Sequence, residues 1–322
     1  MERYAVGVDI GGTNTDLGLV DAGGHIVCRA SLPTGRYAEF APYVADLVAL
    51  ALKLKAECEQ KMQCEVELAG FGIGAPNANF NTCCVVDAVN LPFKGVLDFG
   101  KEIGKHLAVP VALDNDANAA ASGELIYGGA KGMRHVIVFT LGTGVGSGIV
   151  VDGRVVRGAT GAAGELGHVT LVPGGRACSC GHCGCLEAYA SARGIVRTYL
   201  DLRRDEGTGG GILAAVPDEE VSCQAVGDAA RQGDPLAMKA WAMTGEWLGQ
   251  AMANAVAFSS PEAIFLTGGP SRVGEPLMAP LREAFERHLL FFYRGTCAIH
   301  LSSLPSNEAA ILGAASLVMH EA

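Results

Sequence analysis

Positive charge and long apolar runs are both scarce in this chain. Its 322 residues include 24 Lys and Arg against 34 Asp and Glu, which gives a net charge of −10. This balance argues against a nucleic-acid-binding surface, because phosphate backbones are bound mainly by Lys and Arg. No apolar run approaches the ~20 residues that a helix needs to cross a bilayer, and the N-terminus shows a strand pattern with no signal peptide. We therefore expect a cytoplasmic protein that binds neither nucleic acid nor a membrane.

The cysteines do not indicate a disulfide framework. Four of the 11 lie within one loop, and the others are scattered through the chain, as expected for reduced thiols in a cytoplasm. The scattered cysteines are Cys28, Cys58, Cys64, Cys83, Cys84, Cys223 and Cys297. The 44 glycines cluster in short turns, which suggests several places where backbone approaches a ligand closely.

Strands and helices alternate along the chain. With 49% hydrophobic and 18% charged residues, 322 residues can form two lobes, each with its own core. Hydrophobic periodicity predicts strands at 4–9, 16–20, 25–31, 68–74, 111–113, 136–141, 149–151, 154–156 and 263–267. It predicts helices at 38–62, 97–107, 117–127, 235–258 and 307–319. This order indicates an α/β architecture.

One supersecondary unit occurs twice. The strand ending at Asp9 is followed by a glycine turn, a second strand, a tight turn and a third strand, and the same order begins again at Val136. Two copies of one unit predict an internally duplicated, two-lobed protein with its ligand between the lobes.

Both copies carry glycines and a threonine in the turn after the first strand. The turns are Asp9-Ile-Gly-Gly-Thr13 and Thr140-Leu-Gly-Thr-Gly144. Glycine lets successive backbone amides converge on phosphate oxygens, and the threonine hydroxyl adds a donor. One such turn would be weak evidence, since hairpins use glycine anyway, but two are more specific. Asp9, at the end of its strand, could hold a hydrated Mg²⁺.

The loop at 165–191 contains a metal-ligand set. His168, Cys178, Cys180 and Cys185 form the Cys₃His combination of a tetrahedral zinc site, and Cys183 is a fifth candidate. The alternative, buried small thiols or a redox pair, is disfavoured by four cysteines within eight residues that also contain two glycines. Four protein ligands saturate zinc, so a structural ion is expected rather than a catalytic one. The carboxylates of Glu165 and Glu187 flank this set.

Polar residues also separate an apolar strand from a helix at Asp114-Asn115-Asp116-Ala-Asn118. Asp or Asn at this place commonly caps the helix that follows. A carboxylate here could instead act as a general base towards a hydroxyl. The segment by itself leaves both interpretations open.

Taken together, these motifs resemble the ROK family of sugar kinases and sugar-responsive repressors, within the actin-like/hexokinase ATPase superfamily. The resemblance follows the family's order nearly from end to end, and the cysteine loop is its most specific part. The matching segments are Asp9-Ile-Gly-Gly-Thr-Asn, Gly72-Ile-Gly-Ala-Pro, Asn90-Leu-Pro, Asn115-Asp-Ala-Asn, Leu141-Gly-Thr-Gly-Val-Gly, Gly164-Glu-Leu-Gly-His, Cys178-x-Cys-Gly-x-x-Gly-Cys-x-Glu187, Leu266-Thr-Gly-Gly and Ala309-Ala-x-x-Gly-Ala.

The resemblance implies a two-lobed actin-like/hexokinase fold, a ribonuclease H-like duplication with a ligand cleft between the lobes and a structural zinc loop. The expected small lobe is 1–117 with 306–322, and the large lobe is 118–305. It implies that Asp116 is the catalytic base and that zinc is bound by His168, Cys178, Cys180 and Cys185. The implied sugar ligands are Asn77, Asn90, Asn115, Asp116, Glu165, His168 and Glu187. The implied nucleotide-binding residues are Asp9, Gly11, Gly12, Thr13, Asn14, Gly142, Thr143, Gly144, Gly268 and Gly269, with Mg²⁺ accompanying ATP.

The chain departs from the family pattern at Asn77, where most members have glycine. Asparagine tolerates left-handed backbone, so the turn can persist, and its amide could alter the preferred sugar.

The expected function is ATP-dependent phosphorylation of a hexose in carbohydrate metabolism, with glucose at the 6-hydroxyl as the first choice. Fructose, mannose, allose, N-acetylglucosamine and N-acetylmannosamine are the alternatives. A non-enzymatic sugar-sensing regulator is disfavoured, because repressors of the family carry a helix-turn-helix domain before the first glycine turn, which here begins at residue 11. The resemblance also implies a homodimer.

Overall fold

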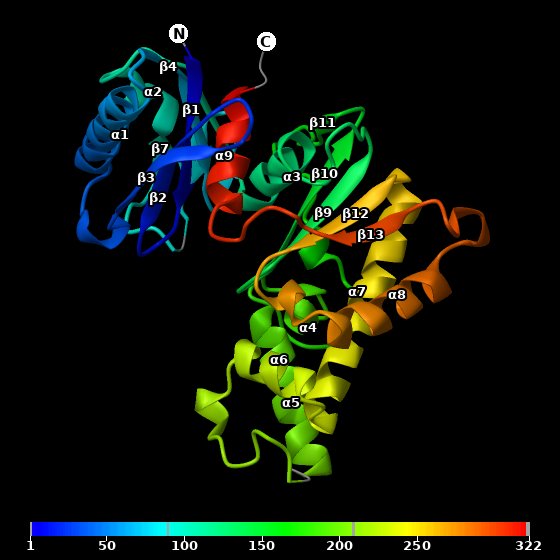
Figure 1. The fold of residues 1–322 in the computed structure, drawn as a ribbon. Helices are drawn as coiled ribbons and strands as arrows, with labels where there is room; N and C mark the ends of the chain where they lie inside the picture. The colour runs from blue at the N-terminus through cyan, green and yellow to red at the C-terminus, as the bar shows by residue number, and fades with distance from the viewer. Residues whose placement is uncertain (1, 89, 208–209, 320–322) are drawn as a thin grey trace. The chain divides into compact units, whose positions relative to one another are not determined.

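A computed structural model describes residues 2–88, 90–207 and 210–319. The chain divides into two compact units (Figure 1). Unit 1 consists of residues 1–133, 155–163 and 303–322, and unit 2 consists of residues 134–154 and 164–302. Within the described residues, no helix is both long and apolar enough to cross a membrane.

Unit 1 is built on a five-stranded sheet in the order β3-β2-β1-β4-β8. Its strands are β1 (Glu2–Ile10), β2 (Thr15–Val20), β3 (Ile26–Leu32), β4 (Val66–Gly74) and β8 (Val111–Asp114). β1 pairs antiparallel with β2 and parallel with β4, and β4 pairs parallel with β8. A smaller sheet contains β5 (Ala78–Asn79), β6 (Cys84–Val86) and β7 (Val96–Asp98).

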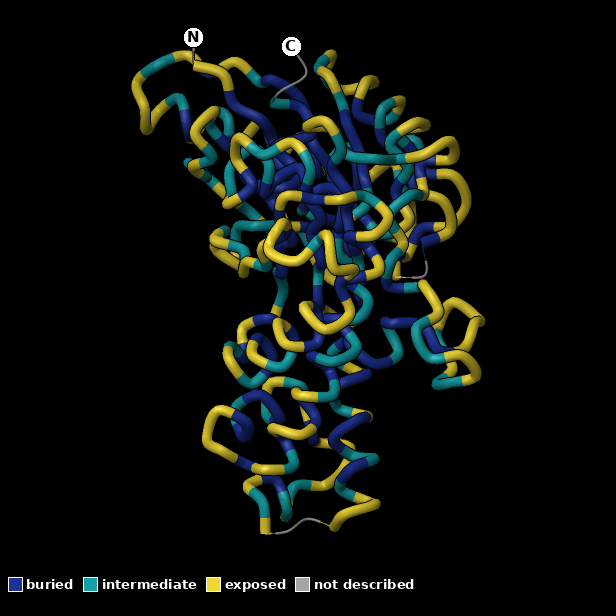
Figure 2. Tube along the Cα trace, turned by 90° about the vertical axis from the view of Figure 1, so that its right-hand side faces the viewer, coloured by how far each residue is buried: buried dark blue, intermediate teal, exposed yellow. Residues whose placement is uncertain are grey.

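The two faces of this sheet bury different side chains. Alternate β1 residues Tyr4, Val6 and Val8 share a core with helix α1 (Phe40–Met62), as the period of two predicts. Ala5, on the opposite face, packs in the cluster of helix α9 (Ala309–Met319). Buried residues follow the interior of these elements, and exposed residues follow the connecting loops (Figure 2).

Helix α9 lies against the sheet at glycine positions. A Cβ on Gly7 would lie 2.2 Å from the Ile311 carbonyl oxygen, and one on Gly72 would lie 1.9 Å from that of Ala314. Gly313 meets α3 (Asp116–Ile126) at Gly123, where an added Cβ would lie 2.8 Å from the Gly313 Cα. The Gly-Ile-Gly and Ala-x-x-Gly-Ala segments therefore have a packing role, which is to bring backbone against backbone.

Unit 2 repeats this topology. Its sheet has the order β11-β10-β9-β12-β13, with β9 (Val136–Leu141), β10 (Val145–Val151), β11 (Arg154–Val155), β12 (Ala263–Thr267) and β13 (Ala298–Leu301). β9 pairs antiparallel with β10 and parallel with β12, as β1 does with β2 and β4. The duplication expected from the sequence is thus confirmed.

Helices make up most of the rest of unit 2. They are α4 (Glu187–Ala190), α5 (Ala192–Glu206), α6 (Cys223–Arg231), α7 (Pro235–Ser259) and α8 (Glu275–His288). Gly245 and Gly249 of α7 let it approach α8 closely, because a Cβ on either would lie within 2.8 Å of α8 atoms.

Some predicted elements are wrong. The helix expected at 97–107 is strand β7 followed by the shorter α2 (Phe99–Gly104), which Asp98 caps by accepting from the Lys101 amide at 2.8 Å. β10 begins at Val145, not Ile149, and α4, α5, α6 and α8 were not predicted. A lobe boundary at residue 117 would cut through α3, which packs against α9 and belongs wholly to unit 1.

Candidate active site and metal centre

The first glycine turn joins β1 to β2 in unit 1. Pairing of Ile10 with Thr15 leaves residues 11–14 as a tight turn, closed by the Gly11 amide donating to the Asn14 carbonyl at 2.9 Å. The side chains of Thr13 and Asn14 are exposed. A Cβ on Gly12 would lie 2.3 Å from the backbone carbonyl oxygen of Asn90. Glycine at position 12 is therefore required by packing as well as suited to phosphate.

The parallel strands bring the acidic residues to one edge of the sheet. Asp9 pairs with Gly74 across β1 and β4, and Gly74 pairs with Asp114 across β4 and β8. The carboxyl ends of neighbouring parallel strands are where ligands of open α/β sheets bind. Asp9 and the segment after Asp114 thus lie at the same edge, which neither motif reveals alone.

Asp116 begins helix α3 but does not cap it. The cap is Asn115, whose side-chain oxygen accepts from the Asn118 amide at 2.7 Å. The capping interpretation therefore applies to Asn115, while Asp116 is exposed. A Cβ on Gly74 would lie 3.9 Å from Asp116 Oδ1, so the small residue keeps this side of the carboxylate open.

Asp9 and Asp116 lose their protons at a higher pH than an ordinary aspartate does. Restricted hydration by the surrounding protein, and then the charge of Asp9, raises the pKa of Asp116 to about 7. Burial, and then the charge of Asp16, raises the pKa of Asp9 to about 6. Asp9 and Asp16 are cross-strand partners in the β1–β2 register. Their mutual repulsion would be relieved by a divalent cation.

Asn77 adopts left-handed backbone, with φ of 54°, as its place in the Gly-Ala-Pro-Asn segment predicts. Its side-chain amide donates weakly to the Val86 carbonyl at 3.4 Å. Asn90 is exposed, and its backbone covers Gly12. Asn77, Asn90 and Asn115 all belong to unit 1.

The second glycine turn joins β9 to β10 in unit 2. The Gly142 amide donates to the Gly144 carbonyl at 3.0 Å, and Thr143 is exposed. The Gly142 carbonyl accepts from the Ala192 amide at 2.8 Å, which ties the turn to the start of α5. Thr143 lines a depression of about 210 Å³ together with Ser179, Arg193 and Arg197.

Glu187 connects this turn to the cysteine loop. Its Oε2 accepts from the Val145 amide at 3.1 Å, and its Oε1 accepts from the Ser179 hydroxyl at 3.0 Å. A Cβ on Gly144 would lie 2.5 Å from Oε2, so a larger residue here would displace the Glu187 carboxylate. A carboxylate has about four lone-pair sites, which leaves capacity for a further hydrogen-bond donor.

His168, Cys178, Cys180 and Cys185 form a cluster whose ligand atoms all lie within 4.8 Å of one another. The Cys180 and Cys185 sulfurs are 3.6 Å apart, and Cys178 Sγ lies 3.6 Å from His168 Nδ1. Tetrahedral zinc with bonds of about 2.3 Å to sulfur and about 2.0 Å to nitrogen requires separations of about 3.8 Å and 3.5 Å. The four residues therefore fit structural zinc.

Cys183, which the sequence leaves open, is exposed and lies outside this cluster. Its neighbour Gly184 has φ of +81°, and a Cβ there would lie 1.8 Å from the Val172 carbonyl oxygen. The loop therefore needs glycine at 184 to bring Cys185 into its buried position.

The segment with Glu165 and His168 packs on β10. The Ser147 hydroxyl donates to the Gly164 carbonyl and accepts from the Leu166 amide. Gly167 touches β10 so closely that a Cβ would lie 1.9 Å from the Val145 carbonyl oxygen. His168 turns Nδ1 towards the cysteines, which leaves Nε2 for a second partner. Glu165 is exposed.

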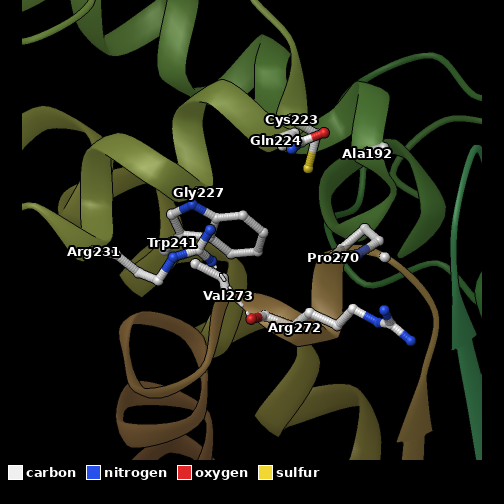
Figure 3. A pocket seen from close by; sticks show the side chains of 10 residues that line it. Ala192, Cys223, Gln224, Gly227, Arg231, Trp241, Pro270, Arg272 and Val273 are labelled. Carbon is white, nitrogen blue, oxygen red and sulfur yellow. Dashed lines mark hydrogen bonds between the residues drawn. The ribbon is translucent and has the colours of Figure 1, made fainter. Parts of the chain in front are cut away.

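A pocket of about 490 Å³ lies beside Gly269 in unit 2 (Figure 3). Cys223, Gln224, Arg231, Trp241 and Arg272 are among its lining residues, and the Cys223 thiol points into it (Figure 3). Its volume is within the ~300–1,000 Å³ typical of small-molecule sites. Gly268, which leads into Gly269, has φ of +95°, and a Cβ there would lie 2.0 Å from the Leu141 carbonyl oxygen.

The sequence did not single out most of these pocket residues. Arg193, Gln224, Trp241 and Arg272 belong to helices or turns outside the glycine motifs, and α5 and α6 were not predicted. The long helix containing Trp241 was predicted, but nothing in its spacing distinguishes a pocket wall from ordinary core.

Comparison with known proteins gives the same family over nearly the whole chain. The ROK family profile matches residues 5–321. A glucokinase of Halalkalibacterium halodurans is 32% identical over 99% of this chain and 96% of its own length. A ROK family glucokinase from Streptomyces griseus, solved in complex with glucose and AMPPNP, is 32% identical with a TM-score of 0.78 and 98% coverage of both chains. A more distant structure, an inorganic polyphosphate/ATP-glucomannokinase of an Arthrobacter strain, is 26% identical with a TM-score of 0.56 and 98% coverage of both chains. The chain belongs to the ROK family and has its duplicated, actin-like α/β fold.

Proposed function

We propose that this protein is an ATP-dependent glucokinase, which transfers the γ-phosphoryl group of ATP to the 6-hydroxyl of glucose. The observation that carries the proposal is Asp116, an exposed carboxylate with a pKa raised to about 7 that does not cap its helix. Glucokinases about one third identical over nearly the full length support the choice of reaction and sugar.

Asp116 would act as the general base. A carboxylate with a pKa near the working pH is a stronger base than an ordinary aspartate. At that pH it is still ionised in a large fraction of the protein molecules. It would accept the proton of the 6-hydroxyl as that oxygen attacks the γ-phosphorus. Phosphoryl transfer otherwise depends on positioning and on stabilising the phosphate charge. The exposed Thr13 and Thr143 and the amides of the two glycine turns would provide those contacts.

Each unit supplies its own candidate contacts to the substrates. In unit 1, we assign Asn77, Asn90 and Asn115 to the sugar; in unit 2, we assign Glu165, His168 and Glu187. Zinc at the Cys₃His cluster would hold His168 and the loop that leads into Glu187. The pocket beside Gly269 would take the adenosine, with Trp241 and Val273 as apolar walls. Mg²⁺ bound near Asp9 would supply charge neutralisation of the phosphates.

A coupled ADP-release assay across glucose, fructose, mannose, allose, N-acetylglucosamine and N-acetylmannosamine tests this proposal. We expect the highest kcat/KM with glucose, and ³¹P NMR should identify glucose 6-phosphate as the product. A higher kcat/KM with another hexose would correct the substrate but retain the reaction. Saturable hexose binding without any ADP release would favour a sugar-sensing regulator instead.

A row of arginines favours inorganic polyphosphate as a second phosphoryl donor. Arg193, Arg197 and Arg204 lie on one face of α5, beginning beside Thr143, and line two adjoining depressions. Asp201 is the shared acidic partner of Arg176, Arg197 and Arg204, at 2.9, 3.9 and 2.5 Å. One carboxylate cannot neutralise these three guanidinium groups, and Arg193 adds another positive charge, so the row stays positive in a chain of net charge −10. A longer chain of phosphates would use this charge, as the polyphosphate-dependent relative suggests.

This second donor is tested by replacing ATP with polyphosphate in the glucose assay. The double variant Arg197→Ala/Arg204→Ala should lose polyphosphate activity and retain ATP activity. The exposed Arg154 is a matched control, and Arg154→Ala should change neither. No glucose phosphorylation from polyphosphate by the wild-type protein would restrict the donor to nucleotides.

A further inference from the structure

The carboxylate that precedes the proposed base is fully buried. Asp114 ends β8 with 0% of its side chain exposed. A buried carboxylate is costly unless every lone pair finds a partner. Asp114 Oδ1 accepts from the Asn115 amide and from Asn118 Nδ2, both at 2.9 Å. These bonds reach both ends of the first turn of α3, and Asp116 lies between them.

The other oxygen of Asp114 is held by Arg157. Arg157 Nε donates to Asp114 Oδ2 at 2.8 Å, and its guanidinium lies 3.5 Å from the centre of the Phe80 ring. Its side chain is 22% exposed. The planar guanidinium can both stack on the ring and donate to the carboxylate, which a lysine ammonium would do less well.

Arg157 belongs to a connecting segment that is itself fixed in unit 1. We call residues 155–163 the strap, because unit 1 contains them although the chain on both sides belongs to unit 2. Asn79 Nδ2 donates to the Thr160 carbonyl at 2.6 Å, and the Ala163 amide donates to the Arg157 carbonyl at 3.1 Å. Gly161, with φ of +80°, lets the strap lie against Asn79. The strap therefore presents Arg157 to Asp114 from a defined position.

We propose that Arg157 is a positioning residue for Asp116, acting through the buried Asp114 carboxylate. Without the guanidinium, Asp114 would have to recruit water or turn away from the first turn of α3. Turning away would release the Asn115 amide and the Asn118 side chain from Oδ1, and a water on Oδ2 would hold the carboxylate less firmly than the guanidinium does. Both changes would loosen the first turn of α3 and with it the direction of the Asp116 carboxylate. This inference rests on the proposed function, because it takes Asp116 as the base.

Steady-state kinetics of Arg157→Ala test the role. We expect kcat for glucose phosphorylation to fall at least tenfold with KM for ATP unchanged, because the nucleotide contacts of unit 2 are untouched. Arg157→Lys, which keeps the charge but not the planar fork, should recover part of kcat. Arg154→Ala, at an exposed position of β11 close to the strap, should behave as wild type. A wild-type kcat in Arg157→Ala would overturn the proposal.

A double-mutant cycle separates positioning from general destabilisation. If Arg157 acts through Asp116, adding Arg157→Ala to Asp116→Asn should cost little further kcat. If the factors by which the two single substitutions lower kcat multiplied in full in the double variant, the proposal would be overturned. Arg157 would then be a structural residue. Should Arg157→Ala not fold, the Arg157→Lys variant carries the same cycle.

Hydrogen exchange gives a readout that does not depend on activity. Amides of 115–118 should exchange at least tenfold faster in Arg157→Ala, while those of α1 keep their wild-type rates. Unchanged exchange at 115–118 would overturn the proposal even if the protein proved inactive towards every hexose. An inactive wild-type protein with faster exchange in the variant would count against the proposed function only.

Discussion

At the scale of single residues, the site places a buried, ion-paired carboxylate next to an exposed one. Asp114 is buried, paired and structural, whereas Asp116, two residues later, is exposed and has no capping role. The residue between them, Asn115, caps the helix. Three adjacent polar residues that look alike in the sequence thus have three different environments. The sequence could not single out Asp114 as the buried, paired residue, because its partner Arg157 lies 43 residues further along the chain.

The first prediction concerns Asp116→Asn. Asparagine keeps nearly the same shape but cannot accept the hydroxyl proton, and general-base catalysis typically contributes ~10²–10⁴-fold. We expect kcat to fall roughly 100-fold or more, with ATP still bound and glucose affinity only modestly weaker. Asn115→Asp, which keeps a capping oxygen, is a matched control for helix stability. If kcat of Asp116→Asn were close to wild type, the base would have to be sought among the remaining carboxylates, Glu165 and Glu187, since Asp114 is buried and paired.

The second prediction follows from the raised pKa of Asp116. A base works only when deprotonated, so kcat/KM for glucose should fall as pH decreases below about 7, the pKa of this carboxyl. The limb near pH 7 should be absent from the residual activity of Asp116→Asn. The same raised pKa means that ionising Asp116 opposes folding as pH rises from its ordinary range through about 7. Thermal unfolding at pH 8 should therefore show Asp116→Asn at least as stable as the wild type, and a lower Tm would contradict this.

At the scale of elements, glycine decides where backbone segments can meet. Gly7 and Gly72 admit helix α9, and Gly268 admits the end of β9. The sequence marks such positions as glycine-rich turns suited to phosphate, yet several are glycine for packing reasons. β10 was predicted short because Gly146, Ser147 and Gly148 lower its β propensity. The strand forms nevertheless, because Val145–Val150 pair in full register with β9.

The third prediction tests this packing at Gly72. A Cβ there would lie 1.9 Å from the Ala314 carbonyl oxygen, which is backbone and cannot rotate away. Overpacking a core typically costs about 1–3 kcal/mol, so we expect Gly72→Ala to lose at least that much unfolding free energy by urea titration. Gly104 in α2, where an added Cβ meets nothing within 4 Å, is the matched control. Gly104→Ala should be neutral or slightly stabilising, and equal behaviour of the two variants would contradict the packing role.

The fourth prediction concerns the cysteine loop. Removing the metal, or replacing Cys180 by Ala, should release the loop and abolish glucose affinity, because Glu187 and His168 are fixed by it. Nucleotide binding should partly survive, since the pocket beside Gly269 is lined by α6, α7 and the turn after β12. Calorimetry with glucose and with AMPPNP measures the sugar affinity and the nucleotide affinity separately. Metal analysis of the wild type should give about one zinc per chain.

Cys183→Ala is the matched control for this loop, since Cys183 lies outside the cluster. It should retain zinc and normal glucose affinity. Loss of zinc in Cys183→Ala, or full zinc occupancy with normal glucose affinity in Cys180→Ala, would show that the ligand set is wrong.

At the scale of the whole molecule, the duplication was predictable and the division of the chain was less so. The repeated order of strand, glycine turn and strand is visible in the sequence because each copy has the same hydrophobic pattern. The strap is not visible, because nothing in its composition shows that residues 155–163 pack with unit 1 while their neighbours pack with unit 2. Such an assignment depends on contacts far apart in sequence, such as those of Arg157 with Asp114 and Thr160 with Asn79.

The last prediction is that glucose compacts the protein. The proposed base lies in unit 1 and the second glycine turn in unit 2, and the chain passes between the units at residues 133–134, 154–155, 163–164 and 302–303. Transfer requires the hydroxyl and the γ-phosphate to meet with water excluded, since water would otherwise accept the phosphoryl group. Binding of glucose should therefore favour a closed arrangement of the two units, and small-angle scattering should show a smaller radius of gyration. Asp116→Asn should still compact, because the asparagine can bind the sugar without catalysis. An unchanged radius of gyration at saturating glucose in both proteins would mean that substrate binding does not close the molecule.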